Sequence, residues 1–365
     1  MTQEQPGNGV PNKFSLYQEI DGTTFEVDLP LTSNVDPNEL REKLGLPAYI
    51  DLDYFPLKSA MVTLWASANA QRLHEWYPQA YEKKVSDNAI PALFFGGAAV
   101  KIHCKSANAG GSLERQIKDT DFIIPKKCGA SFSKLLLGMD KAFGTQFKYF
   151  RPKSDMIFNA MRQGQRYRIR TINGITKEGL PMVTVLDIFC DYIDLRHKIE
   201  VKKSFERCSE NLYTIGLENL ILSKAQFIMD YPKSELTILK EHGQEFRILP
   251  YENYSPDKVI LGMEEKDTKD VCAVFLDHPI GKRPEEIDAG KMLEVLERDK
   301  KFALTVELNL QNLKERTEIL EKWLSRSDIS AISDGIGELL TGLPKVDKKW
   351  DKPWWNTAVE TPSIV

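Results

Sequence analysis

The segment 92–125 constrains the fold most, because it joins an apolar run, a glycine pair and an acidic pair. The apolar run ends in Gly96 and Gly97, which predicts a buried strand that closes on a turn of bare backbone. Residues 98–103 have a helix-compatible composition, and residues 106–112, rich in Gly, Ala and Asn, predict a loop. The segment therefore predicts a strand, a glycine turn, a helix and a second strand, in that order.

Asp119 and Asp121 stand at the start of that second strand. Period-2 alternation puts both carboxylates on one face, about 7 Å apart, while residues 122–124 build the core. Two carboxylates at that spacing can hold a hard cation between them. The pair therefore predicts a metal site.

A β-hairpin is predicted from residues 166–172 and 182–189, with its turn near Asn173 and Gly174. The first strand of the hairpin carries three arginines on one face, namely Arg166, Arg168 and Arg170. Such a row suits a triphosphate or a nucleic-acid backbone. It equally suits a solvated sheet edge that is protected by charge.

Two helical motifs follow. Lys224 projects from the apolar face of a helix that begins near Leu217, so its ammonium either extends out of the core or meets the phosphates of a nucleotide. Without bound ligand, Lys224→Met would hardly change thermal stability, because Met keeps the apolar stem. Asp267 and Asp270 share one face of a later helix, and we expect Asp270, which abuts the apolar run, to orient Lys224 or the metal site.

The order of these motifs resembles a known family. A strand with two glycines, a helix and then Arg115-x-x-Lys118-Asp119-x-Asp121 resembles the nucleotidyltransferase core of the DNA polymerase β-like fold. The lysine motif at Lys224 and the Asp-x-x-Asp motif at Asp267 make it more similar to the AbiEii/AbiGii toxin-like branch. The similarity covers about residues 90–280.

The resemblance implies an α+β fold: a polymerase β-like nucleotidyltransferase core of mixed sheet and helices, a helical C-terminal region and an N-terminal extension. It implies a third carboxylate on the hairpin, for which Asp187 is the candidate and Asp191 and Asp194 are rivals. Asp119, Asp121 and Asp187 would then be the metal ligands, and with Lys224 the catalytic residues.

The resemblance also implies a phosphate-binding turn. Gly96 and Gly97 are preferred for it, because a helix must fit between the turn and the acidic strand; the cluster Gly110-Gly111-Ser112 competes. Nucleotide binding would involve Gly96, Gly97, Arg115, Lys224 and Asp270.

The implied activity is magnesium-dependent nucleotidyl transfer. Two Mg²⁺ ions, with Mn²⁺ as a substitute, would help to move a nucleoside monophosphate from a nucleoside triphosphate such as ATP to a hydroxyl of an RNA (tRNA-like) or protein acceptor. Such an enzyme would suit the toxin of a toxin–antitoxin or phage-defence system, with a cognate antitoxin as partner. The alternative is a catalytically silent nucleotide- or RNA-binding or scaffold protein on the same fold.

Composition and patterning set the remaining expectations. A formal net charge of −4 argues against a general nucleic-acid coat, and the absence of an apolar run of membrane-spanning length predicts a cytoplasmic protein without membrane contact. Tryptophans within 345–355 either stack bases or dock on the same molecule. The predicted division is a disordered 1–13, an N-terminal extension of hairpin plus helices at 14–89, the catalytic core at 90–205, a mainly helical domain at 206–340 and a tail at 341–365.

Overall fold

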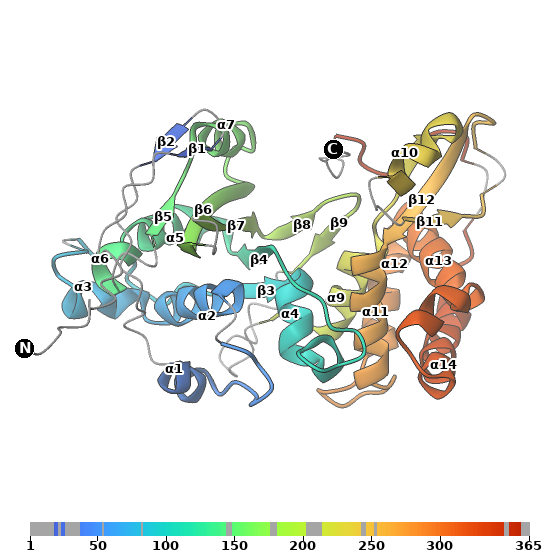
Figure 1. Ribbon diagram of the computed structural model, residues 1–365, viewed down its shortest axis with the longest axis horizontal. Helices are drawn as coiled ribbons and strands as arrows, with labels where there is room; N and C mark the ends of the chain where they lie inside the picture. The colour runs from blue at the N-terminus through green and yellow to red at the C-terminus, as the bar shows by residue number, and fades with distance from the viewer. Residues whose placement is uncertain are drawn as a thin grey trace, which may run out of the picture. The chain divides into compact units, whose positions relative to one another are not determined.

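The computed structural model describes residues 18–20, 23–25, 37–52, 55–81, 83–143, 148–175, 181–201, 214–241, 246–251, 254–346 and 350–358. Two compact units make up the chain: the first comprises 1–45, 52–92 and 118–190, and the second comprises 46–51, 93–117 and 191–365. Figure 1 labels the elements of both. The predicted core 90–205 is thus divided differently, because 93–117 belong to the second unit and 118–190 to the first. The predicted disorder at 1–13 lies outside the described residues.

The first unit combines helices with strands. Its helices are α1 (Pro37–Leu44), α2 (Phe55–Ala68), α3 (Leu73–Trp76), α5 (Gly129–Leu137), α6 (Met139–Phe143) and α7 (Lys153–Met161). Its strands are β1 (Gln18–Ile20), β2 (Thr23–Phe25), β4 (Asp119–Ile124), β5 (Lys148–Phe150), β6 (Arg166–Ile175) and β7 (Pro181–Cys190).

A mixed sheet organises this unit, with its strands in the order β4-β7-β6-β5. β4 and β7 run parallel, whereas β6 is antiparallel to both β7 and β5. The sheet is mixed because a hairpin joins β6 to β7 while a crossover separates β4 from β7. Helices with a mixed sheet agree with the predicted α+β class; the polymerase β-like assignment within that class stays a prediction.

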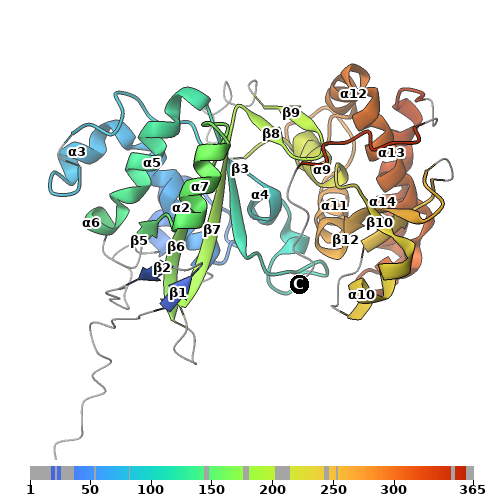
Figure 2. The same ribbon diagram turned by 90° about the horizontal axis from the view of Figure 1, so that it is seen from above.

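Helices α2 and α5 cover one face of the sheet (Figure 2). Phe122 of β4 meets Phe132 of α5 with ring centroids 5.9 Å apart, and both side chains are fully buried. Strand alternation directs Asp119 and Asp121 to the opposite face, because each is an odd number of residues from Phe122. The apolar core under α2 and α5 therefore fixes which face carries the carboxylates.

The hairpin is confirmed, but its turn is not where the Asn173-Gly174 signal predicts it. Gly174 pairs with Met182 and Ile175 with Pro181, so both strands continue past the predicted turn. The register shifts between Ile172 and Gly174, which indicates a bulge at this point. The Asn-Gly pair therefore marks a bulge inside the strand.

The second unit contains more helix. Its helices are α4 (Gly96–His103), α9 (Leu217–Ala225), α10 (Leu236–Glu241), α11 (Glu265–Asp277), α12 (Ala289–Arg298), α13 (Lys300–Glu315) and α14 (Arg326–Gly342). Its strands are β3 (Leu93–Phe95), β8 (Tyr192–Asp194), β9 (Lys198–Glu200), β10 (Met229–Pro232), β11 (Phe246–Leu249) and β12 (Lys258–Glu264).

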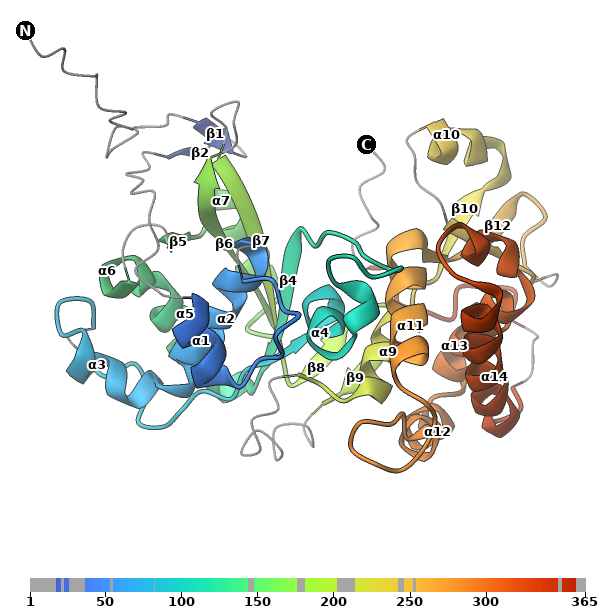
Figure 3. The same ribbon diagram turned by 60° about the horizontal axis from the view of Figure 1, so that its bottom comes forward.

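Helix α11 is central to the second unit, since it packs against α4, α9 and α14 (Figure 3). Its apolar face, which includes Val271 and Val274, is buried. A three-stranded antiparallel sheet, β10-β12-β11, adjoins these helices. The sequence analysis did not predict this sheet, whose strands lie between the helical motifs at Lys224 and Asp267.

The C-terminal tryptophans dock on the same unit, which confirms that reading over base stacking. Trp354 and Trp355 are 3% and 6% exposed and pack into a cluster with Ile228, Leu249 and Leu304. The Trp354 indole N–H donates to Thr305 Oγ1 at 2.9 Å. Among the described helices, none has the length and apolar character needed to cross a membrane.

Candidate functional site

The predicted site residues fall into two groups, one in each unit. We call the group on β4 and β7 of the first unit the carboxylate face: Asp119, Asp121 and Asp187. We call the group in the second unit the ion-pair network: Arg115, Lys224, Asp267 and Asp270.

Strand register forms the carboxylate face. Asp121 pairs with Asp187 across the parallel strands β4 and β7, so both side chains leave the same face of the sheet. Asp119 lies two residues earlier on β4 and shares that face. Asp119 is exposed and Asp121 half-buried, whereas Asp187 is only 7% exposed. The first unit thus carries all three predicted carboxylates on one face of its sheet.

The rivals for the third position lie elsewhere. Asp191 belongs to the second unit and has a left-handed backbone with a φ of 63°. Asp194, in the same unit, is exposed at the end of β8. Only Asp187 of the three is in register with β4, which favours it over both rivals.

Two arginines of β6 hold Asp187. Arg166 Nη2 donates to Asp187 Oδ2 at 2.8 Å, and Arg168 Nε donates to Oδ1 at 3.1 Å. The Arg166 guanidinium also lies over the Phe189 ring, 4.4 Å from its centroid, and the Arg168 guanidinium lies 4.4 Å from the Phe158 centroid. Rings and carboxylate together fix both guanidiniums on the face that carries Asp121.

The third arginine has its own partner. Arg170 forms a bidentate pair with Asp155 of α7, through Nε at 2.9 Å and Nη2 at 3.1 Å. The side chains of Arg166, Arg168 and Arg170 are only 11%, 20% and 16% exposed, so the reading of a solvated sheet edge is wrong. All three arginines are paired with carboxylates.

Sequence reasoning missed the contribution of α7. β5 ends opposite Arg170, and beyond it the Asn159 side chain takes up the open edge of β6: it accepts from Arg168 N–H at 2.6 Å and donates to Arg168 C=O at 3.0 Å. This contact holds Arg168 where it reaches Asp187. The spacing of Asp155 and Asn159, four apart on one helical face, is the signal that indicates a shared role.

The ion-pair network lies between α9, α11 and the segment before β4. Lys224 Nζ lies 3.0 Å from Asp267 Oδ1 and 2.9 Å from Asp270 Oδ2. Arg115 makes a bidentate pair with Asp270, through Nε at 2.7 Å and Nη2 at 2.5 Å. Both readings of Lys224 are therefore incomplete, because the chain itself supplies its anion.

Burial makes these pairs strong. Burial acts against both charged forms, yet Asp270 and Asp267 raise the pKa of Lys224 above its ordinary value. Burial would raise the pKa of Asp270, but Lys224 and Arg115 outweigh it and lower that pKa to about 2. Lys224 and Asp270 therefore both carry their charges at neutral pH.

The local structure requires glycine at both positions of the predicted turn, Gly96 and Gly97. Gly96 has a φ of 64°, in the left-handed region that favours glycine. A Cβ on Gly97 would lie 2.5 Å from Arg115 Nη2 and 2.7 Å from Ile117 Cγ2. The start of α4 must therefore be bare for the Arg115 guanidinium to reach Asp270.

In the competing cluster Gly110-Gly111-Ser112, the glycine N–H groups form hydrogen bonds within their own loop. Gly110 N–H donates to Glu114 Oε2 and Gly111 N–H donates to Asn108 C=O, each at 2.9 Å. A Cβ on Gly111 would lie 2.2 Å from the Ser106 carbonyl oxygen. These backbone donors are occupied, which leaves Gly96 and Gly97 as the better candidates for a phosphate-binding turn.

Over the residues that the structure describes, no three His, Cys, Asp or Glu side chains lie together in a way that could hold a metal ion. No protein-family model matches the chain, and comparisons with curated proteins and with solved structures find no match either.

Proposed function

We propose that the protein is a magnesium-dependent nucleotidyltransferase with a polymerase β-like core, which moves a nucleoside monophosphate from a nucleoside triphosphate to a hydroxyl of an RNA or protein acceptor. The observation that carries the proposal is the register of β4 and β7, which sets Asp121 beside Asp187 with Asp119 on the same face. Carboxylates crowded on one face repel one another unless cations neutralise them.

The residues fit magnesium through the two carboxylates of β4. Mg²⁺ is commonly held by one or two carboxylates together with substrate phosphates and waters, so Asp119 and Asp121 suffice as its protein ligands. When bound, the ions would neutralise the triphosphate and lower the pKa of the acceptor hydroxyl. Asp187, whose oxygens face Arg166 and Arg168, would act as the third carboxylate by positioning these guanidiniums beside Asp121.

Arg166 also offers an unused donor. Its Nε is buried and, among the described residues, has no hydrogen-bond partner. A buried donor without a partner costs free energy, and a phosphate oxygen would satisfy it. This supports a phosphate group on the carboxylate face. The roles predicted for Gly96, Gly97, Arg115, Lys224 and Asp270 toward the nucleotide stay predictions.

The test is transfer of label. The protein is incubated with each α-³²P-labelled nucleoside triphosphate, Mg²⁺ and total RNA or cell lysate, and the labelled product is resolved. Asp121→Asn should lose transfer by orders of magnitude, because it removes one metal ligand. Asp194→Asn, which changes an exposed carboxylate of the second unit, is the matched control and should keep full transfer. Full transfer by Asp121→Asn, with an unchanged melting temperature, would end the proposal.

The ion pairs at Asp187 favour a second candidate, a nucleotide- or RNA-binding protein without catalysis. Both Asp187 oxygens already accept from arginines, so these guanidiniums can neutralise the face without a cation. For this candidate, nucleoside triphosphates would bind without divalent ions and no label would move to any acceptor.

A further inference from the structure

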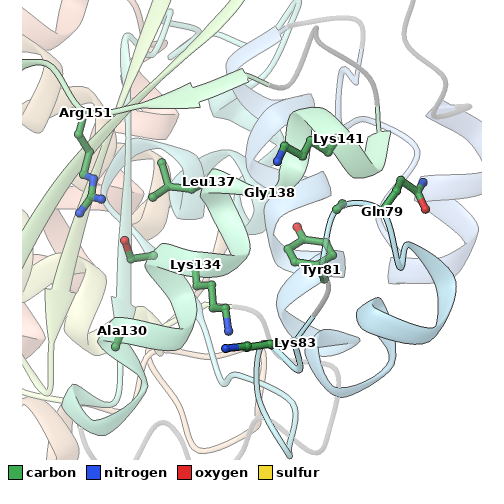
Figure 4. Close-up of a pocket in the computed structure, with 11 residues that line it drawn as sticks. Gln79, Tyr81, Lys83, Ala130, Lys134, Leu137, Gly138, Lys141 and Arg151 are labelled. Atoms are coloured by element: carbon green, nitrogen blue, oxygen red, sulfur yellow. The ribbon is translucent and has the colours of Figure 1, made fainter.

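The first unit contains a hollow of about 540 Å³ that the proposed activity does not use (Figure 4). It is lined by one face of α5 and α6, by residues 79–81 and Lys83, and by Arg151, which follows β5. α5 covers the face of the sheet opposite the carboxylate face, since Phe132 packs on Phe122. The hollow is therefore a separate place on the same unit.

Cationic side chains dominate its lining: Lys83, Lys134, Lys141 and Arg151. No carboxylate is among the residues that line it, as far as the structure describes them. Across the same described residues, none of the four takes part in an ion pair. Within the described part of the lining, positive charge is thus concentrated in a concave surface, and no described side chain there supplies a counter-charge.

The lysines are brought together by the fold. Lys134 of α5 and Lys141 of α6 both line the hollow, so the two consecutive helices present these lysines on the same side. Figure 4 shows the ends of Lys83 and Lys134 pointing toward each other. Lys134 Nζ donates to the Lys84 carbonyl at 3.2 Å, which holds it next to the segment that carries Lys83.

Residues 79–81 of the lining are anchored to the helices through Tyr81. Tyr81 is 3% exposed, and its hydroxyl donates to the Leu135 carbonyl at 2.7 Å. A Cβ on Gly138 would lie 2.4 Å from Tyr81 Cε1, so the absence of a side chain at the α5–α6 junction lets the ring approach. The wall that carries Lys83 is therefore fixed by packing.

The cationic side chains that line the hollow favour phosphate as the ligand. Ammonium and guanidinium groups bind phosphate oxygens through charge-assisted hydrogen bonds, and Gln79 and Ser133 lie beside them as neutral donors. The one aromatic ring of the lining, Tyr81, is buried and so offers no open face for stacking a base. The hollow can recognise phosphate groups and not nucleobases.

We propose that this hollow is a binding site for phosphate groups, carried either by a free polyphosphate or by the backbone of a single-stranded RNA. The site stands on the first unit alone and does not depend on the carboxylates or on nucleotidyl transfer.

The experiment compares two triple variants of the full chain. Lys83→Gln/Lys134→Gln/Lys141→Gln removes three charges from the hollow; Lys126→Gln/Lys127→Gln/Lys153→Gln removes three from exposed lysines of the same unit that do not line it. All six side chains are exposed, so both variants should keep the melting temperature of the parent. The probes are tripolyphosphate, followed by calorimetry, and a fluorescent 12-nucleotide RNA, followed by anisotropy, both without divalent ions.

The hollow variant should bind at least ten-fold more weakly, and the control variant within two-fold of the parent. Loss for tripolyphosphate alone identifies a small polyphosphate as the ligand; loss for RNA, with a salt dependence reduced by about two phosphate contacts, identifies the backbone. Lys→Arg at the same three positions should restore binding. Equal weakening by both Gln variants, or no binding of either probe by the parent at millimolar concentration, would overturn the proposal.

Discussion

At the scale of single residues, Lys224 shows which contacts can be predicted from the sequence and which cannot. Helical spacing correctly indicates that its ammonium needs an anion, and it points to Asp270. It cannot show that Asp267 and Asp270 both pair with Lys224 and that Arg115 also pairs with Asp270, because that depends on how separate segments pack. The carboxylate face was more predictable, because strand alternation and the register of β4 with β7 are enough to set the positions of its three carboxylates.

The network reverses the expectation that Lys224→Met would leave stability nearly unchanged. Removing the ammonium leaves Asp267 and part of the Asp270 charge buried and unpaired, so we expect a loss of about 3 kcal/mol or more in unfolding free energy. Lys291→Met is the control: its side chain is 47% exposed, 3.7 Å from Glu218 and Asp288, and should cost less than about 1 kcal/mol. Urea unfolding measures both, and equal small losses would show that the network adds no stability.

At the scale of elements, strong periodicity was sufficient for β4, β6, β7, α9 and α11. The apolar periodicity over residues 131–143 alone predicts one helix, but the structure has two, because Gly138 separates α5 from α6 where Tyr81 packs. The hairpin turn was misplaced because an Asn-Gly pair serves a bulge as well as a turn. The sheet β10-β12-β11 was missed because its strands are short and separated by long connections.

The start of α4 gives a prediction at this scale. Gly97→Ala would push its methyl against Arg115 and Ile117, displace the guanidinium from Asp270 and cost about 1–3 kcal/mol in unfolding free energy. In Gly337→Ala, the matched change within α14, the methyl meets only the flexible end of Lys314 and gains helix propensity, so it should be neutral or stabilising by up to about 1 kcal/mol. Thermal melting of both variants decides; a Gly97→Ala protein as stable as the parent would contradict the close approach.

At the scale of the whole molecule, neither unit is a continuous piece of chain, and no local pattern in the sequence shows this. The chain passes between units after residues 45, 51, 92, 117 and 190. Periodicity reports elements and their faces, whereas the assignment of elements to units depends on which faces pack together. The predicted boundaries at 89 and 205 followed motif order and so could not separate 93–117 from 118–190.

The two units should differ in their response to acid. In the second unit, burial lowers the pKa of His103 and of His197 to about 4, below the ordinary 6.5. The unfolded chain therefore binds more protons between these values, so stability falls as pH drops from about 6.5 to 4, by on the order of 3 kcal/mol for each histidine. The lowered pKa of Asp270, about 2, adds its loss only below pH 4.

Tryptophan fluorescence can follow this loss in one unit. In a Trp65→Phe/Trp76→Phe variant, the remaining tryptophans belong to the second unit, with Trp354 and Trp355 buried in its core. We expect its urea midpoint to fall markedly between pH 7 and pH 4.5, and His197→Gln to reduce the fall. A midpoint that does not change with pH would contradict neutral buried histidines.

The alternation of the chain between the two units also affects how the protein folds during its synthesis. On the ribosome, β3 and α4 emerge long before α9 and α11, the helices against which α4 packs. At about 5–20 residues per second, α4 waits on the order of ten seconds for α11 to be complete. During that interval apolar side chains of α4 that the finished molecule buries, among them Ala99 and Val100, are open to other chains. The nascent chain, and not the folded protein, is then the stage at which this sequence is most prone to aggregate.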